Sequence, residues 1–346
     1  MKRILKGFGL LFLLATVAAT FLSVGCAPPE EPQQPQSPTP TRKILFLGDS
    51  IAEAILGASP LSERESYGYY GVVGIVNNFW YVNRSISGHQ TKQLLDYIRQ
   101  SDDGAMLTDT HIRTADIIHI SILGNDLLQN NLGEIMYNEL IGETEITDLI
   151  LAKAAENFAA IVTVLREKNP DAVLIFQSVY NPIHPDSVLV NARVRKLLAD
   201  RGIAPDQYRT QCQPTLDKLN DIPRSYFEDH PDAFIYLDVC AEFNRIYDAD
   251  PDRGIRLIYS DDIHPSNEGH AVIADLITDQ MIRLGFTDAA DALTAYRNHR
   301  IRQAQRLFPS LAQAIETELN AAPDRQTVTE RYFDLTEGHL PSYLPA

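Results

Sequence analysis

The sequence predicts an α/β protein in which helices cover both faces of a parallel sheet. Apolar runs typical of buried strands alternate with segments whose apolar residues recur at helical spacing, and this alternation favours β-α-β units. A Gly-Asp-Ser turn follows the first apolar run, Ile44 to Leu47. In open α/β sheets, ligands bind just outside the carboxyl ends of the strands. Ser50 is therefore the first candidate for a functional residue.

The N-terminal region has the composition of an export signal. A basic start precedes an apolar stretch from Gly7 to Val24. The stretch from Leu22 to Cys26 resembles the processing site of bacterial lipoproteins, although Ser23 stands where a larger aliphatic residue is usual. We expect residues 1–25 to be removed and Cys26 to be lipidated, which predicts an extracytoplasmic, membrane-anchored lipoprotein. An uncleaved membrane anchor and a plain secreted protein are the alternatives.

Residues 26–41 predict an extended tether, because proline recurs among Glu, Gln, Ser and Thr and no core can form. At about 3.1 Å per residue, the tether spans up to roughly 45 Å. The main domain is expected over residues 42–286. The formal net charge of −16 excludes nucleic acid as a partner, since binding to phosphates needs a basic surface.

The strands and helices of the main domain are expected in alternation. Residues 51–56 are expected to open a helix directly after Ser50. A proline ends the helix that follows the third strand, while Ser266 caps the last helix and Gly285 stops it. Expected strands are 44–47, 79–86, 116–123, 172–179 and 233–239; further helices are expected at 90–99, 151–168 and 266–284.

Two segments exceed what this core needs. Residues 185–231 form an insertion between the fourth and fifth strands, and residues 287–346 form a helical C-terminal extension. Cys212 and Cys240 form an even pair that can close a disulfide in an oxidising compartment, or they are separate buried thiols. The extension's expected buried positions are Leu293, Tyr296, Ile301, Leu307, Leu311 and Ile315.

Ser50 can act as a nucleophile only beside a base, because a serine hydroxyl is inert near neutral pH. His264 is the best candidate for that base, and Asp261, three residues earlier, can reach its Nδ1 across a tight turn. Read singly, the three residues fit a turn, a surface histidine and a turn cap. Asp262 also precedes His264, but from two residues away its carboxylate is expected to face another side of the loop.

Acyl transfer also needs hydrogen-bond donors where negative charge develops on oxygen. The Ser50 backbone N–H, Gly88 and the Asn125 amide can supply them, because each follows an apolar run and meets the others at the same edge of the sheet. His119 is interpreted as a core residue. His89 and His184 are interpreted as possible pocket residues.

Four blocks of the sequence, taken in order, resemble those of the SGNH (GDSL-type) hydrolase family. They are Gly48-Asp49-Ser50, Gly88, Gly124-Asn125-Asp126 and Asp261 to His264, and Pro265 to His270 resembles that family's usual continuation. The resemblance implies a flavodoxin-like three-layer α/β/α fold and ester hydrolysis. It also implies Ser50, Asp261 and His264 as the triad, and Ser50, Gly88 and Asn125 as the oxyanion hole. Ile51, where leucine is common, is a mild departure.

The sequence therefore predicts a serine esterase or lipase that acts through an acyl-enzyme and needs neither a cofactor nor a metal. Its expected partners are a small-molecule, lipid or acylated-glycan ester and, through lipidated Cys26, the membrane. A carbohydrate or cell-wall O-acetylesterase is the alternative among enzymes. A catalytically inactive binding module tethered to the envelope is the alternative from another class.

Overall fold

The computed structural model describes residues 41–55, 63–100 and 103–339. The predicted export signal, Cys26 and all but the last residue of the tether lie outside these residues. The centre of the described part is a five-stranded parallel sheet with strand order β2-β1-β3-β4-β5, the flavodoxin-like order. The strands are β1 (Lys43–Gly48), β2 (Trp80–Asn83), β3 (Ile117–Ser121), β4 (Val173–Gln177) and β5 (Ile235–Leu237).

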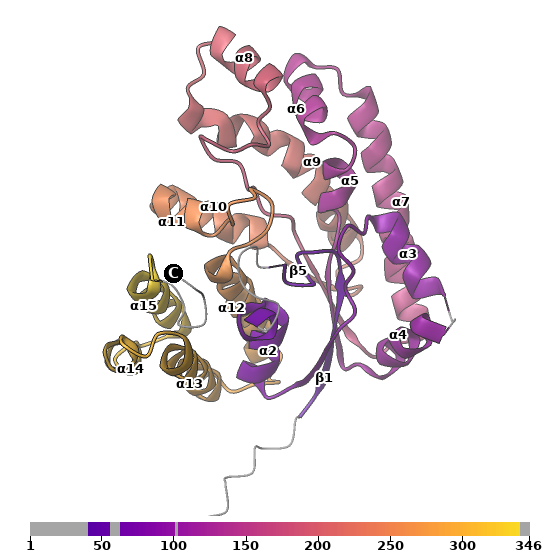
Figure 1. The fold of residues 1–346 in the computed structure, drawn as a ribbon. Coiled ribbons are helices and arrows are strands. Elements are labelled where there is room, and N and C mark those ends of the chain that lie inside the picture. The colour runs from indigo at the N-terminus through magenta and orange to yellow at the C-terminus, as the bar shows by residue number, and fades with distance from the viewer. Residues whose placement is uncertain (1–40, 56–62, 101–102, 340–346) are drawn as a thin grey trace, which may run out of the picture. The chain divides into compact units, whose positions relative to one another are not determined.

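Helices cover both faces of the sheet, as Figure 1 shows, and the strand residues alternate between two cores. Ile44 and Phe46 face α2 (Tyr69–Asn77), α10 (Val239–Ala249) and α12 (Asn267–Arg283). Leu45 and Leu47 face the opposite core, formed by the three helices α3 (Thr91–Arg99), α7 (Glu145–Lys168) and α9 (Tyr208–Asp229). The predicted three-layer α/β/α fold is therefore confirmed.

The strands β2, β3, β4 and β5 lie inside the predicted runs and are shorter, whereas β1 extends one residue beyond the predicted run 44–47 at each end. The expectation that residues 51–56 open a helix is wrong over the described part: residues 51–54 form turns, and Leu56 lies outside the described residues. Ala54 has φ of 60°, a left-handed conformation that stops a helix. The Ala52 carbonyl accepts a hydrogen bond from Asn83 Nδ2 instead of a helical N–H.

Helices also collect beyond the carboxyl edge of the sheet. After β3 come α5 (Gly124–Leu128) and α6 (Leu132–Ile141), and after β4 come α8 (Ala192–Asp200), the short η2 (Pro205–Gln207) and α9. Figure 1 shows α6 and α8 side by side. They share a small apolar core with the start of α9, made of Met136, Ile183, Val190, Val194, Leu198, Tyr208 and Cys212.

We call α6, residues 181–207 and the first half of α9 the cover. The second half of α9 is different, because Leu219 belongs to the core beneath the sheet and Tyr226 packs on Phe158 and Phe234. The interval 185–231 thus holds both a cover and the crossover helix between β4 and β5. The contribution of α6 to the cover is not foreseen from the sequence.

The C-terminal extension comprises α13 (Ala289–Leu307), α14 (Ala312–Asn320) and α15 (Arg325–Thr336). It packs against α2 and α12 and so adds a layer outside the sandwich (Figure 1). Of the predicted buried positions, Tyr296, Ile301, Leu307 and Ile315 are buried, and Leu293 and Leu311 are partly buried against the same core.

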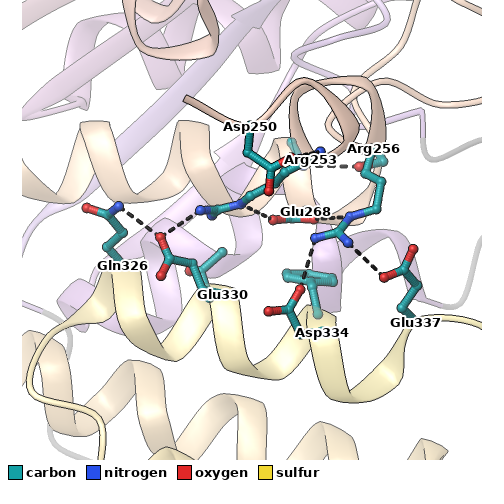
Figure 2. Close-up of polar contacts among 12 residues, drawn as sticks. Asp250, Arg253, Arg256, Glu268, Gln326, Glu330, Asp334 and Glu337 are labelled. Atoms are coloured by element: carbon teal, nitrogen blue, oxygen red, sulfur yellow. Dashed lines mark hydrogen bonds and ion pairs between the residues drawn. The ribbon is translucent and has the colours of Figure 1, made fainter. Parts of the chain in front are cut away.

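Ion pairs hold α15 to the helices beside it (Figure 2). Arg253 of α11 (Pro251–Arg256) donates to Glu268 of α12 at 2.9 Å and to Glu330 of α15 at 2.6 Å. Arg256 donates to Asp334 at 2.9 Å and to Glu337 at 2.7 Å. The extension therefore contacts the helices on both sides of the loop that carries His264.

The remaining described helices are short or lie at the edges of the layers. They are α1 (Arg64–Tyr67) and α4 (Asp103–Thr114). Cys212 and Cys240 are both buried free thiols, so the reading with two separate thiols holds. Within residues 41–55, 63–100 and 103–339, no helix is long and apolar enough to cross a membrane.

Candidate active site

Ser50 lies on the sharp turn that ends β1. Gly48 has φ of 141°, and a Cβ at this position would lie 1.9 Å from the Ser121 carbonyl oxygen of β3, so a side chain cannot be accommodated. The Asp49 N–H donates to that carbonyl at 3.1 Å, and Asp49 Oδ1 accepts the Ile51 N–H at 3.0 Å. These contacts fix the turn and leave the Ser50 side chain half-buried at the strand tip.

The carboxyl group of Asp49 is almost completely buried. Burial raises its pKa to about 7, against the opposing effect of the Ile51 N–H, and the charge of Asp126 raises it further. Asp126 is itself buried and accepts hydrogen bonds from the Thr91 N–H at 3.0 Å and the Thr91 hydroxyl at 2.7 Å. Burial also raises the pKa of Asp126. The two carboxyl groups at the strand tips beneath Ser50 are thus shielded from solvent.

His264 lies on a closed loop between α11 and α12. The loop's two ends pair, since the Tyr259 N–H donates to the His264 carbonyl at 2.8 Å and the Ser266 N–H donates to the Leu257 carbonyl at 2.8 Å. Ser266 Oγ then caps α12 by accepting the Gly269 N–H. A Cβ on Gly269 would lie 2.2 Å from the Leu257 oxygen. The Pro265 to His270 motif therefore anchors the loop.

Asp261 orients the imidazole of His264. One carboxylate oxygen lies 2.5 Å from His264 Nδ1, and the other accepts the backbone N–H groups of Ile263 and His264 at 3.0 Å. Partial burial raises the pKa of Asp261, but these hydrogen bonds outweigh it and the net pKa is lowered. His264 Nε2 is buried and has no hydrogen-bond partner among the described residues, so it is available to accept a proton.

Asp262 faces the other way, toward the cover. It has φ of 61°, and its buried carboxylate accepts His184 Nε2 at 2.8 Å and the Val188 N–H at 2.5 Å. The predicted difference in direction between Asp261 and Asp262 is confirmed. His184 is therefore occupied by Asp262 and does not line the cavity beside Ser50.

The loop that holds Gly88 and His89 lies against the first turn of α5, which holds Asn125. Asn125 Nδ2 donates to the His89 carbonyl at 3.1 Å, and the Asn125 carbonyl accepts from Gln90 Nε2 at 3.2 Å. Gly88 has φ of 81°, which favours glycine for conformational reasons. The structure thus joins two of the blocks that the sequence analysis proposes for the oxyanion hole.

An apolar cavity of about 90 Å³ opens beside Ser50. Ser50, Asn125 and Ile263, the neighbour of His264, line it, whereas Gly88, His89 and His264 itself do not. The remaining lining residues are Asp49, Ile51, Gly124, Leu127, Leu128, Leu132, Val179, Tyr180, Pro182, Leu189, Leu216 and Leu219.

The prediction that His119 is a core residue is confirmed, because it is fully buried in β3 and burial lowers its pKa to about 3. His89 packs edge-on against Tyr97. In the part of the chain that the structure describes, no three His, Cys, Asp or Glu side chains are grouped to hold a metal ion.

Sequence reasoning missed two features of the site. Tyr180, at the tip of β4, donates its hydroxyl to the Ile263 carbonyl at 2.5 Å and stacks on Phe243, which ties the histidine loop to the sheet. Leucines of α5, α6 and α9 line the cavity. The recurrence of leucine just after Asn125, at Leu127, Leu128 and Leu132, was the available clue.

A sequence model of the GDSL-like Lipase/Acylhydrolase family matches residues 46–272. A comparison with curated proteins found no match. Among solved structures, the chain is similar to phospholipase A1 from Streptomyces albidoflavus, with 15% identity, a TM-score of 0.49, and coverage of 69% of this chain and 98% of that one.

Two further solved structures are similar at comparable levels. A lipase from a goat rumen metagenome has 17% identity, a TM-score of 0.45, and coverage of 69% of this chain and 97% of that one. A mutant of an acetyl-xylooligosaccharide esterase from Geobacillus Stearmophilus has 17% identity, a TM-score of 0.45, and coverage of 70% and 94%. Because the family model matches well over half of its residues, the chain belongs to the GDSL-like lipase/acylhydrolase family.

Proposed function

We propose that the protein is an extracytoplasmic, lipid-anchored serine esterase that hydrolyses carboxylic esters through an acyl-enzyme. The observation that carries the proposal is the pairing of Asp261 with His264 Nδ1 at 2.5 Å, which leaves Nε2 without a partner. Ser50, at the tip of β1, lines the same cavity as Ile263, the residue before His264. Membership of the hydrolase family supports this assignment.

In the proposed mechanism, Ser50 Oγ attacks the ester carbonyl carbon while His264 Nε2 takes the hydroxyl proton. Asp261 holds the tautomer that has its proton on Nδ1 and stabilises the imidazolium. The Ser50 and Gly88 N–H groups and Asn125 Nδ2 stabilise the oxyanion. The C–O bond of the alcohol breaks as His264 returns the proton to the leaving oxygen.

Water completes the reaction. His264 deprotonates a water molecule that attacks the acyl carbon, and the acid leaves as the Ser50 hydroxyl is restored. These reaction steps use only the chain's own residues and water. Location outside the cytoplasm and anchoring through Cys26 are supported by the sequence alone, from the basic and apolar segment that precedes it.

The test combines covalent labelling with a series of p-nitrophenyl esters from acetate to decanoate. An organophosphonate should modify Ser50, located by mass spectrometry, and Ser50→Ala should lower kcat by at least about 10³-fold while the protein stays folded. Ser260→Ala, a change at an exposed serine of the histidine loop, is the matched control. No turnover of any ester by folded wild-type protein would favour a binding module, and a preference for acetate would favour an O-acetylesterase.

A further inference from the structure

The cavity beside Ser50 does not end at the wall of the cover. A second cavity of about 50 Å³ lies next to it and shares Leu127, Leu132, Pro182 and Leu216 with the first. The two cavities lie next to each other in space. Ser50 lines the first cavity, and Cys212 lines the second. The shared residues therefore separate the two cavities.

The second cavity is lined mostly by apolar side chains, and its polar side chains are those of Asn181, Cys212 and Thr215. All the described residues that line it are uncharged. The amide of Asn181 is already satisfied, since its Nδ2 donates to Gln213 at 2.8 Å and its Oδ1 accepts the Ile183 N–H at 2.9 Å. Burial raises the pKa of the Cys212 thiol to about 11, so the thiol is neutral at physiological pH. Hydrocarbon is the chemistry that this lining favours.

The ester carbonyl fixes where such hydrocarbon would start. An ester attacked by Ser50 has its carbonyl in the part of the first cavity that Ser50 and Asn125 line. One of its two substituents can then follow the apolar lining of α5, α6 and α9, while the other leaves toward solvent. The apolar course points away from Ser50 and into the cover.

We propose that the two cavities form one acyl-chain site, and that the natural substrate is an ester of an unbranched, medium-length fatty acid. This inference rests on the proposed function. The acyl chain passes between Leu132 of α6 and Leu216 of α9, and its end lies against Met136 and Cys212. Leu216 acts as the specificity-determining residue, because it borders both cavities.

A series of p-nitrophenyl esters measures this site directly. Each methylene that becomes buried should raise kcat/KM about fourfold, from butyrate upward until the second cavity is full. Cys212→Met should fill the second cavity and lower the decanoate-to-butyrate ratio of kcat/KM at least tenfold. Leu216→Ala should open the wall and raise that ratio, so the two variants move it in opposite directions.

Val194→Ile is the matched control, because Val194 is buried in the same cover core but lines neither cavity. It should leave the ratio within about twofold of wild type. A wild-type kcat/KM that does not rise beyond butyrate, or equal loss on all esters in Cys212→Met, would overturn the acyl-chain site. So would a ratio that Val194→Ile shifts as much as Cys212→Met does.

A binding measurement separates this inference from the proposed chemistry. Ser50→Ala cannot turn over an ester, and calorimetry should still detect binding of 1-decanol that weakens at least tenfold in Ser50→Ala/Cys212→Met. Decanol binding without hydrolysis of any ester by wild type would uphold the site and refute the proposed function. Hydrolysis through Ser50 without decanol binding or a chain-length effect would refute the site alone.

Discussion

The cover and the C-terminal extension are both additions to one sheet, and both contain ion pairs. Arg193–Glu134 and Lys218–Glu139 join helices of the cover, as Arg253–Glu330 joins α11 to the extension. The two regions differ in how they contact the rest of the molecule. The cover meets the sheet at its carboxyl edge through leucines that leave cavities between them. The extension packs on the far side of α2 and α12, where apolar contacts are joined by arginine and carboxylate pairs (Figure 2). We therefore expect the cover to determine which substrate is chosen and the extension to contribute to the stability of the fold.

The histidine loop lies between the cover and the extension in the sequence. Substitution of its two aspartates, Asp261 and Asp262, is expected to give the largest difference in activity. Asp261→Asn should lower kcat on a soluble ester by one to several orders of magnitude, because the amide favours the wrong tautomer and cannot stabilise the imidazolium. Asp262→Asn should change kcat by less than about tenfold, since its carboxylate faces His184 and Val188.

Both variants need a check of folding by circular dichroism before kinetics. Asp262→Asn replaces a buried acceptor and should cost about 1–3 kcal/mol of stability. If Asp262→Asn proved the slower enzyme, the orienting carboxylate would be the one that faces the cover. The assignment of Asp261 to catalysis and of Asp262 to contacts with the cover would then be wrong.

Arg325 tests the extension. It pairs with Asp275 at 2.7 Å and with Asp279, so it links α15 to α12. Arg325→Ala should lower the free energy of unfolding by about 2–3 kcal/mol, less than for a fully buried pair because a cleft of about 430 Å³ opens beside these residues. The urea midpoint reports this change, and the ratio of kcat/KM between long and short esters should not move.

Arg331→Ala is the matched control on the same helix, since Arg331 pairs with exposed Glu318. It should shift the urea midpoint by much less than Arg325→Ala does. If Arg325→Ala changed the ratio of kcat/KM between long and short esters and left the urea midpoint unchanged, the extension would influence substrate choice rather than stability.

The buried carboxyl of Asp49 gives a pH dependence with a defined sign. Its pKa is about 7 in the fold, against about 3.9 for an aspartate in an unfolded chain, so between about pH 4 and pH 7 the folded state holds a proton that the unfolded state has lost. Stability should therefore fall as pH rises through this window, by up to about 1.4 kcal/mol per pH unit. Asp49→Asn, which mimics the protonated group, should remove this slope.

Urea unfolding of wild type and Asp49→Asn at pH 5 and pH 8 measures the effect. The variant should gain stability relative to wild type at the higher pH. A difference that is the same at both pH values would mean that Asp49 ionises normally and that the strand tips are wetter than their burial indicates.

The smallest effect is expected at the rim of the extension. Glu337 pairs with Arg256 at 2.7 Å, and both side chains are substantially exposed. Glu337→Gln should change the free energy of unfolding by less than about 0.5 kcal/mol, because exposed ion pairs gain little over hydration. A loss comparable to that of Arg325→Ala in the same urea assay would show that the whole network in Figure 2 acts as a unit.

The sequence predicted the parts of the molecule that depend on local pattern. Strand runs such as Ile44 to Leu47 are apolar whatever their neighbours, and Ser266 followed by Gly269 marks a helix start by its own hydrogen bonds. The direction of Asp261 was also predictable, because an aspartate three residues from a histidine returns across a single turn.

What depended on distant contacts could not be predicted. Residues 51–54 are compatible with a helix. The Ala52 carbonyl nevertheless accepts its hydrogen bond from Asn83 Nδ2, which lies far along the chain. The role of α6 is set by apolar contacts with α8 and α9, to which no periodicity in its own residues points. Tyr180 could be placed at a strand tip, but not against Ile263, which lies 83 residues away.

The double connection at the histidine loop has a consequence for motion. The Asp262 carboxylate accepts a hydrogen bond from the Val188 N–H of the cover. The Tyr180 hydroxyl, at the tip of β4, donates a hydrogen bond to the Ile263 carbonyl. Both bonds end on a loop whose ends are paired, so we expect the two bonds to open together. The Val188 N–H should therefore exchange its hydrogen with solvent only when the whole loop opens in one cooperative step. We therefore expect the cover to act as a fixed wall of the site, past which the substrate enters.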